Sequence, residues 1–435
     1  MKAYIFNTFV VCTFLLAACN NSIGIEVSKP TIDSRGENNT DILIGAIEEG
    51  TITETDENSR LIFVIIPEHI PVGDIKVENT ISLSELKGLN HVLLVTEETS
   101  PGNPYDGPID IFLVGNNTNT MKEARNYYLS LDKIFYQKSS IPQKLIDPYM
   151  NDYYGDNLLW YSERHLRNIS IDGMHYLCMS YDLETPECLE NENLSAAETK
   201  IEIFEGKTFM ASFQNEYLDF LLSRDFLYYI YGEKIDNNYT YTLYKTMGKE
   251  KIISSPILCS SGIISEDSHF LIDMNYYIDE FVKLYSLNEN KLVEKIYFSG
   301  KGHVRQMSSD GELLCTSGYN TYLTTKNRTE AQVIGQYMFD PLLSPDGQYL
   351  AYTIYPPMFF SSYVKYQEDG KTPLDKENEE IESRLKQMAK GIYILELSSG
   401  KTAFLPLTLK EGSEGFNIIG WAAKEPVDQF IKENQ

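Results

Sequence analysis

The chain has 435 residues, of which 63 are acidic and 37 are lysine or arginine, so its formal net charge is −26. An acidic excess of this size repels phosphate backbones and anionic lipid surfaces, and it excludes nucleic acid as an expected partner. The hydrophobic fraction of 42% is sufficient for a packed core, whereas six cysteines without a Cys-x-x-Cys pair exclude a disulfide-built or zinc-ribbon scaffold.

The first residues of the chain have the pattern of an export signal. Lys2 supplies a positive charge, residues 3–16 are mostly apolar, and the run is shorter than a comfortable membrane span. The sequence Leu16-Ala17-Ala18-Cys19 resembles the lipobox of bacterial lipoproteins. This resemblance implies that residues 1–18 are a lipoprotein signal peptide and that lipid is attached to Cys19. The alternative is an ordinary secretory signal whose cleavage site happens to contain a cysteine.

Residues 19–40 are polar and rich in Ser, Asn and Gly, which predicts a flexible tether between lipid and folded domain. The membrane, reached through the N-terminal lipid, is therefore an expected partner, and the expected location is the bacterial cell envelope. Asn20 follows Cys19. In lipoprotein sorting patterns, an Asp at this position marks a protein that is not sent to the outer membrane. The resemblance to those patterns favours the outer membrane in a cell with two membranes.

Strand-like apolar runs follow at residues 61–66, 92–96 and 109–114. They match no repeated motif, and they are predicted to supply the strands of one sheet. A C-terminal strand after Trp421 is expected to complete that sheet and close a ring, since free edges at the two ends of a ring would otherwise be exposed.

One short pattern recurs along the body of the chain: an apolar residue, Ser, any residue and Asp, followed by an apolar run. The successive Asp residues are 36 to 53 positions apart, and a four-stranded propeller blade takes roughly 40 to 50 residues. The apolar runs predict buried strands. The six copies are Leu129-Ser130-Leu131-Asp132, Ile169-Ser170-Ile171-Asp172, Leu222-Ser223-Arg224-Asp225, Ile264-Ser265-Glu266-Asp267, Met307-Ser308-Ser309-Asp310 and Leu343-Ser344-Pro345-Asp346.

The Ser and Asp of each copy predict a turn between two strands, because their side chains can bond nearby backbone amides. Gly173, Gly311 and Gly347 follow three of the Asp residues and accept positive φ without a Cβ clash. The repeated Asp residues at 172, 225, 267, 310 and 346 also suggest a ring of carboxylates, but the turn role is sufficient to explain them.

Residues 343–352, Leu-Ser-Pro-Asp-Gly-Gln-Tyr-Leu-Ala-Tyr, are followed at 391–402 by a strand, a Gly-containing turn and a second strand. These residues resemble the repeat of TolB-like β-propellers, a family related to the propeller of prolyl oligopeptidases. The resemblance is close at 343 and loose in the other five copies. It implies an all-β fold, a single β-propeller domain at 41–435 with four-stranded blades. Six copies plus a closing blade predict seven blades, with six or eight as alternatives.

The stretch 356–390 is predicted to be an insertion in a late blade. Without it, the 78 residues between Leu343 and Trp421 reduce to one blade length. Ile381, Leu385 and Met388 give its second half the pattern of an amphipathic helix. Such a helix either packs on the rim of the blade, or binds a partner or caps the pore.

The sequence carries none of the common catalytic motifs. It contains no Gly-x-Ser-x-Gly, no phosphate-binding Gly-Lys-Ser/Thr loop, no His-Glu-x-x-His and no calcium-binding loop. The histidines at 69, 91, 165, 175, 269 and 303 are not spaced as metal ligands, so surface or loop positions are expected, without metal or cofactor. Cys178 and Cys315 fall on buried strands, and Cys178 pairing with Cys188 is the alternative to a free thiol.

Two functions from different classes are compatible with these observations. The first is a non-catalytic, lipid-anchored binding or scaffolding module for an envelope protein, peptide or glycan; this is the expected function, with no catalytic residues. The second is an envelope enzyme, of polysaccharide lyase or hydrolase type, with catalytic residues in the central funnel. Converging histidines, arginines or carboxylates with shifted pKa values would favour the enzyme, and an exposed apolar patch would favour the binding module.

Overall fold

The computed structural model describes residues 59–64, 80–99, 111–138, 163–182, 198–215, 220–235, 238–249, 251–255, 263–273, 282–289, 291–298, 303–317, 320–325, 327, 329–354, 364–367, 372–387, 390–408 and 413–435. This part of the chain is mainly β-structure, as the repeats predict. The expected signal peptide (1–18), the tether (19–40) and Cys19 lie outside the described residues.

The described strands form six sheets, which we number I to VI. Sheets I to V each use strands that are consecutive in the chain, and sheet III gains one more strand, β1 (Arg60–Val64), which pairs in parallel with β16. The strands are β4 (Gln137–Lys138), β5 (Glu163–Ile169), β6 (His175–Asp182), β7 (Glu198–Glu205) and β8 (Thr208–Asn215) in sheet I; β9 (Phe220–Leu222), β10 (Tyr228–Ile235), β11 (Asn238–Lys245) and β12 (Lys251–Ser255) in sheet II; β13 (Ile263–Ile264), β14 (Phe270–Asp273), β15 (Val282–Ser286) and β16 (Lys291–Phe298) in sheet III; β17 (His303–Met307), β18 (Leu313–Ser317), β19 (Asn320–Thr324) and β20 (Ala331–Gln336) in sheet IV; and β21 (Met338–Leu343), β22 (Tyr349–Ile354), β23 (Gly391–Glu396) and β24 (Thr402–Pro406) in sheet V.

Sheet VI joins the two ends of the described chain. Its middle strand, β2 (His91–Thr99), pairs antiparallel with β3 (Ile111–Val114) on one side and with β25 (Ser413–Ala423) on the other. The predicted union of N-terminal strands with a C-terminal strand is therefore present for the runs at 92–96 and 109–114. It is wrong for the run that begins at residue 61, because β1 pairs with β16 in sheet III. Trp421 lies near the end of that strand rather than before it, and helix α7 (Lys424–Asn434) follows instead of a further strand.

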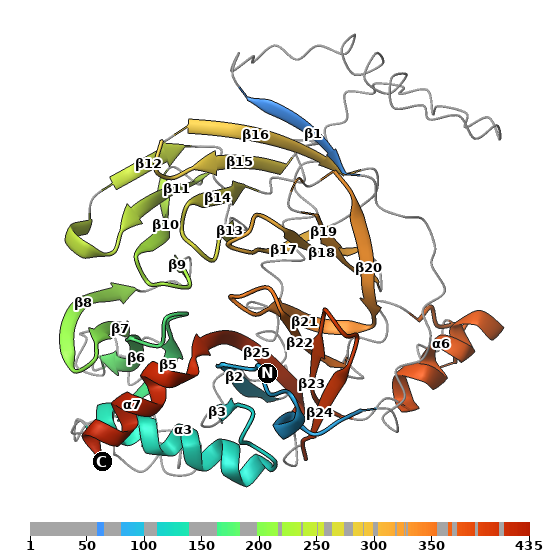
Figure 1. Ribbon diagram of the computed structural model, residues 1–435. Helices are drawn as coiled ribbons and strands as arrows, with labels where there is room; N and C mark the ends of the chain where they lie inside the picture. Colours follow the sequence, from blue (N-terminus) through green and yellow to red (C-terminus); the bar gives the residue numbers. More distant parts are fainter. Residues whose placement is uncertain are drawn as a thin grey trace, which may run out of the picture.

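The sheets follow one another around the molecule, with sheet VI between sheets V and I (Figure 1). Backbone bonds link neighbouring sheets at the ends of β25, β5, β9, β13 and β17. Ala423 N donates to Ile171 O (2.9 Å), and Ile171 N donates to Arg224 O (2.8 Å). On the far side, Glu266 N donates to Met307 O (3.1 Å). This arrangement of meandering sheets around a common centre is of the propeller type.

The Ser-x-Asp pattern forms the predicted turn between β5 and β6 in sheet I, β9 and β10 in sheet II, β13 and β14 in sheet III, and β21 and β22 in sheet V. In the copy at 343, Ser344 Oγ donates to Asp346 Oδ1 (2.6 Å) and accepts from Tyr349 N (2.9 Å), while Gly347 N closes the turn on Ser344 O (2.9 Å). The same bonds recur from Ser170, Ser223 and Ser265. We call the end of the ring that carries these turns the turn face.

The residue after the motif Asp has positive φ in all five of these turns, including the one at 308–311 in sheet IV. Gly173, Gly311 and Gly347 take this position with φ of 71°, 86° and 66°. In the two copies that lack glycine, Phe226 (62°) and Ser268 (55°) adopt the same conformation, which is strained for a residue with a Cβ. The expected use of glycine is therefore confirmed, and two copies form the turn without it.

The sixth copy, at 129–132, is helical, so the prediction of a turn and strand there is wrong. Helix α3 (Met121–Phe135) begins at a capping box between Thr120 and Glu123, and Ala124, Tyr128, Leu131 and Phe135 give it one buried face. Ser-x-Asp at 130–132 has no turn to form inside this helix. Removing this copy leaves six sheets in the described residues, where seven blades were expected.

The predicted insertion helix is present as α6 (Lys376–Gln387), between β22 and β23. In Figure 1 it lies outside the ring, beside sheet V. Aromatic side chains fill much of the core, and Tyr176, Tyr349, Tyr352 and Tyr393 are fully buried. Within the described part, no helix combines the length and apolar character that crossing a membrane requires.

Candidate functional site

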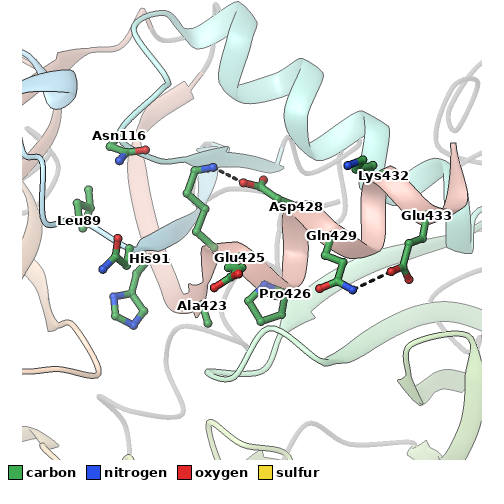
Figure 2. Close-up of a pocket in the computed structure, with 12 residues that line it drawn as sticks. Leu89, His91, Asn116, Ala423, Glu425, Pro426, Asp428, Gln429, Lys432 and Glu433 are labelled. Atoms are coloured by element: carbon green, nitrogen blue, oxygen red, sulfur yellow. Dashed lines mark hydrogen bonds and ion pairs between the residues drawn. The ribbon is translucent and has the colours of Figure 1, made fainter.

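A pocket of about 1220 Å³ opens at the start of α7. Its walls are the residues that lead into β2, the loop after β3, and one side of the helix (Figure 2). The polar lining includes His91, Asn116, Asp428, Gln429 and Glu433. The pocket lies on the turn face, because Ala423, at the end of β25, bonds to the turn residue Ile171.

Backbone contacts set the position of α7 and thereby shape the pocket. Lys424 N donates to Asn90 O (2.9 Å), which ties the first residue of the helix to the chain entering β2. On the opposite side, α7 packs on sheet I through Val427 and Ile431, both buried. A Cβ at Gly173 would lie 2.5 Å from Ala423 O, so only glycine allows this close approach.

Most charged groups of the pocket already have partners within it. Lys424 forms an ion pair with Asp428, which also accepts a hydrogen bond from Tyr127 Oη. Gln429 Nε2 donates to Glu433 Oε1 (2.8 Å), and Figure 2 shows both interactions along the helix. Paired in this way, these side chains form a polar wall of fixed charge rather than reactive groups.

His91 differs from these paired side chains. Its ring stands edge-on to Trp421, with centroids 6.4 Å apart, and its buried Nδ1 has no hydrogen-bond partner. The nearest carboxylate oxygen, Asp346 Oδ2, is 3.8 Å from Nδ1, which is longer than a hydrogen bond. Burial lowers the pKa of His91 and outweighs the opposing effect of Asp346. The imidazole is therefore neutral near pH 7 and can donate or accept a hydrogen bond from a ligand.

Three other described histidines, His165, His175 and His269, lie beside carboxylates. His165 lies between Asp132 (3.1 Å from Nδ1) and Glu163 (3.2 Å from Nε2), and His269 Nδ1 lies 2.7 Å from Asp267 Oδ2. The expectation of surface or loop positions thus fails for His91, His165 and His175, whose side chains are largely buried at strands. No group of three metal-ligating side chains occurs in the part of the chain that the structure describes, and His69 lies outside it.

A second buried polar cluster joins sheets III, IV and V near the centre of the ring. Gln306 Nε2 donates to Glu266 Oε1 (2.5 Å) and to Leu343 O (2.9 Å), and Gln306 Oε1 accepts from Leu343 N (2.6 Å). Burial raises the pKa of Glu266. Because every one of these bonds connects neighbouring sheets, the cluster serves assembly of the ring.

The motif carboxylates act in the turns. Asp172, Asp225, Asp267 and Asp346 each accept from the Ser of their own motif and from a backbone amide two residues on. Cys178 and Cys315 are buried free thiols, and burial raises the pKa of each to about 12, so neither is a thiolate nucleophile near neutral pH. Cys188, the suggested partner of Cys178, lies outside the described residues.

The pocket was not visible in the sequence. It combines residues around 90, Asn116 and residues 423–433, which lie at opposite ends of the chain, and none belongs to the repeated motif. The available signal was indirect: a histidine at the start of a strand expected to pair with the C-terminal strand.

No protein-family model matches the chain, and no curated protein matches it. Among solved structures, TolB from Acinetobacter baumannii is similar, with a TM-score of 0.37 and 10% identity over 84% of this chain and 96% of that one. The β-propeller domain of the Trilobed protease from Pyrococcus furiosus has a TM-score of 0.32 and 11% identity, covering 55% of this chain and 71% of that one. The acylaminoacyl peptidase of Pyrococcus horikoshii has a TM-score of 0.32 and 11% identity over 56% of this chain, which spans 39% of that protein. Similarities this low do not decide between a binding protein and an enzyme.

Proposed function

We propose that this chain is an exported, lipid-anchored cell-envelope protein, that its six sheets are the blades of one propeller, and that it acts as a non-catalytic binding module. The pocket beside α7 is the ligand site, and its ligand is a peptide or glycan segment. The lipid is carried by Cys19, in the outer membrane if the cell has two. The proposal includes no metal, cofactor or nucleic acid.

The composition of the pocket carries this proposal. None of its lining residues is Ser, Thr, Cys or Tyr, so the described wall offers no hydroxyl or thiol nucleophile. Of its three acids, Asp428 is engaged by Lys424 and Tyr127, Glu433 accepts a hydrogen bond from Gln429, and Glu425 is exposed to solvent. What the pocket offers is hydrogen bonding, from neutral His91 and from Asn116 and Gln429, which suits reversible binding of amide or hydroxyl groups.

One observation favours the enzyme alternative: the pKa of His91, on the turn face, is shifted, and acid–base catalysts also have shifted pKa values. A lyase or hydrolase would need His91 to exchange a proton with the substrate during each turnover. Binding and catalysis therefore predict different results for the same substitution.

An array of envelope-derived peptides and oligosaccharides tests the proposal directly. The full chain, His91→Ala and Asn116→Trp are compared, with Asn288→Trp as a control on the turn of sheet III. We expect bound probes to be recovered intact and at least ten-fold weaker binding in the two pocket variants. Cleaved probes whose formation stops in His91→Ala would establish the enzyme instead, and equal binding by all four proteins would remove the pocket as the site.

The anchor is tested separately by growing cells with labelled palmitate. We expect label in the natural chain and none in Cys19→Ala, which should move to the soluble fraction. Label that persists in Cys19→Ala, or its absence from both, contradicts lipid attachment at this residue.

A further inference from the structure

Four large apolar side chains protrude from the turns of sheets I and II. Met174, Phe209, Leu227 and Met247 are 51%, 53%, 48% and 51% exposed. Met174 and Leu227 follow the motif Asp of their sheets by two residues. Phe209 lies at the turn between β7 and β8, and Met247 lies at the turn between β11 and β12. We call these four residues the apolar tips.

The apolar tips share one end of the ring. In sheet I, Gly206 N donates to Met174 O (3.0 Å), so the turn before Phe209 lies beside the motif turn. In sheet II, Thr246 N donates to Leu227 O (2.9 Å), which places the turn that holds Met247 in the same way. The bond from Ile171 N to Arg224 O joins the two motif turns, and the tips therefore form one patch across neighbouring sheets.

Equivalent positions in the other sheets are polar. Two residues after the motif Asp, sheet III has His269, sheet IV has Glu312 and sheet V has Gln348. No large hydrophobic side chain is exposed on the described turns of these three sheets on the turn face. The same turn forms in all five sheets, with an apolar residue at this position in two and a polar residue in three. The turn itself therefore does not require the apolar residues of sheets I and II.

The charge around the tips is also reversed relative to the rest of the chain. Among the residues of these turns that the structure describes, the exposed charged ones are Lys207, Lys245, Lys249 and Glu205, three basic and one acidic. The whole chain has 63 acidic residues against 37 basic. Asp172 and Asp225 are half-buried and accept hydrogen bonds within their turns. Apolar tips with a lysine rim therefore form a local exception on a strongly acidic protein.

We propose that the apolar tips are a membrane-docking surface that rests on a bilayer containing anionic lipid. This inference uses the proposed lipid anchor only for the nearness of the membrane, which raises the effective concentration of the bilayer at the patch. Met, Leu and Phe on turns enter the boundary between headgroups and acyl chains, and neighbouring lysines bind anionic headgroups. The acidic remainder of the chain is repelled by the same surface, so the repulsion orients the protein with this patch toward the lipid.

The experiment compares two tryptophans placed at the same position of the repeat. Leu227→Trp lies in the patch, and Gln348→Trp lies at the corresponding residue of sheet V; both carry the chain's two native tryptophans as a common background. Each full-length variant is reconstituted by detergent removal into vesicles of phosphatidylcholine with brominated acyl chains, with or without phosphatidylglycerol. The apolar N-terminal residues, or the acyl chains if present, hold both variants at the bilayer, so the contrast reports which face contacts lipid.

We expect quenching by brominated chains to be several-fold greater for Leu227→Trp than for Gln348→Trp, and greater with phosphatidylglycerol than without. Lys207→Glu combined with Lys249→Glu should reduce the quenching, whereas Lys291→Glu combined with Lys401→Glu, on the turns of sheets III and V, should not. Equal quenching at the two positions, or none at either, overturns the proposal. The palmitate experiment reports on Cys19 alone, so failure of the anchor and failure of the patch give distinct results.

Discussion

The turn face is built from one repeated turn, yet sheets I and II differ from sheets III, IV and V in what they present there. The first pair exposes the apolar tips and a lysine rim, and sheet I also packs against α7. The other three expose polar side chains such as His269 and Gln348. The shared Ser-x-Asp bonds fix the backbone of the turn, and they leave the residue two positions after the Asp free to vary. Differences between copies of a repeat are therefore better indicators of function than the repeat itself.

The largest expected effect comes from replacing one turn glycine in each region by alanine. Gly173→Ala should cost about 3 kcal/mol, because positive φ costs about 1–2 kcal/mol and the new Cβ meets Ala423 O at 2.5 Å. Gly347→Ala should cost only about 1 kcal/mol, since its nearest neighbour, Glu312 Oε2, is 3.9 Å away. Denaturant unfolding of both variants measures the difference. Equal losses would show that α7 does not press on the turn of sheet I.

A second expected effect concerns helix α7, which packs on sheet I and on α3. Phe430 stacks on Tyr176 at 4.6 Å and on Phe135 at 5.6 Å between ring centroids. Phe430→Ala should lower the free energy of unfolding by about 2–3 kcal/mol, through lost apolar contact and stacking. The control, Leu374→Ala, removes a side chain that is 53% exposed and should change it by less than about 0.5 kcal/mol. Similar values for the two would mean that α7 contributes little to stability.

A smaller effect, of opposite sign, is expected in the polar region. Ser268 has φ of 55° and a buried Oγ without a hydrogen-bond partner, so Ser268→Gly should stabilise the protein by about 1 kcal/mol. Phe226 occupies the same turn position in sheet II but is 3% exposed, and Phe226→Gly should destabilise because lost packing exceeds the relieved strain. Thermal unfolding distinguishes the two signs; stabilisation by both changes would contradict this account.

The smallest effect is a dependence on pH at sheet I. A hydrogen bond with Asp172 raises the pKa of His175 more than burial lowers it. The negative charges of Glu205 and Asp225 raise this pKa further. Protonated His175 therefore stabilises the fold below its unfolded pKa of about 6.5, and this contribution is lost as pH rises through the folded pKa. From pH 6 to pH 8 the natural chain should lose a few tenths of a kcal/mol more than His175→Gln. Parallel stability curves for the two proteins would contradict this role.

The pKa of the partner acid sets the lower limit of this pH window. Burial would raise the pKa of Asp172, but hydrogen bonds from His175, Ser170 and Met174 outweigh burial and hold it at about 2. Its stabilising contribution is thus complete above the unfolded pKa of about 3.9 and falls away only as pH approaches 2. The His175 effect can be measured between these limits without interference from its partner.

Local chemistry explains which parts of the fold were predictable. Ser, Asp and Gly specify a turn through bonds among neighbours in sequence, so five of the six turns and the strands after them were found. The copy at 129–132 failed because four buried residues at helical spacing outweigh a Ser-x-Asp pair. The pocket depends on β2 meeting β25 and α7, which no local pattern encodes. The apolar tips were visible in the sequence, but only after the copies were aligned by turn position.

Sheet VI also has a consequence for how the chain reaches its folded state. Sheets I, II, IV and V pair strands that are close in sequence, whereas β2 must find β25 across most of the chain, with His91 opposite Ala423. During synthesis or export from the N-terminus, β2 and its apolar residues 92–95 emerge long before their partner and remain an unpaired edge. We therefore expect closure of the ring to be the last and slowest step of folding. Before closure the chain is most prone to aggregate, and a chaperone would be most useful then.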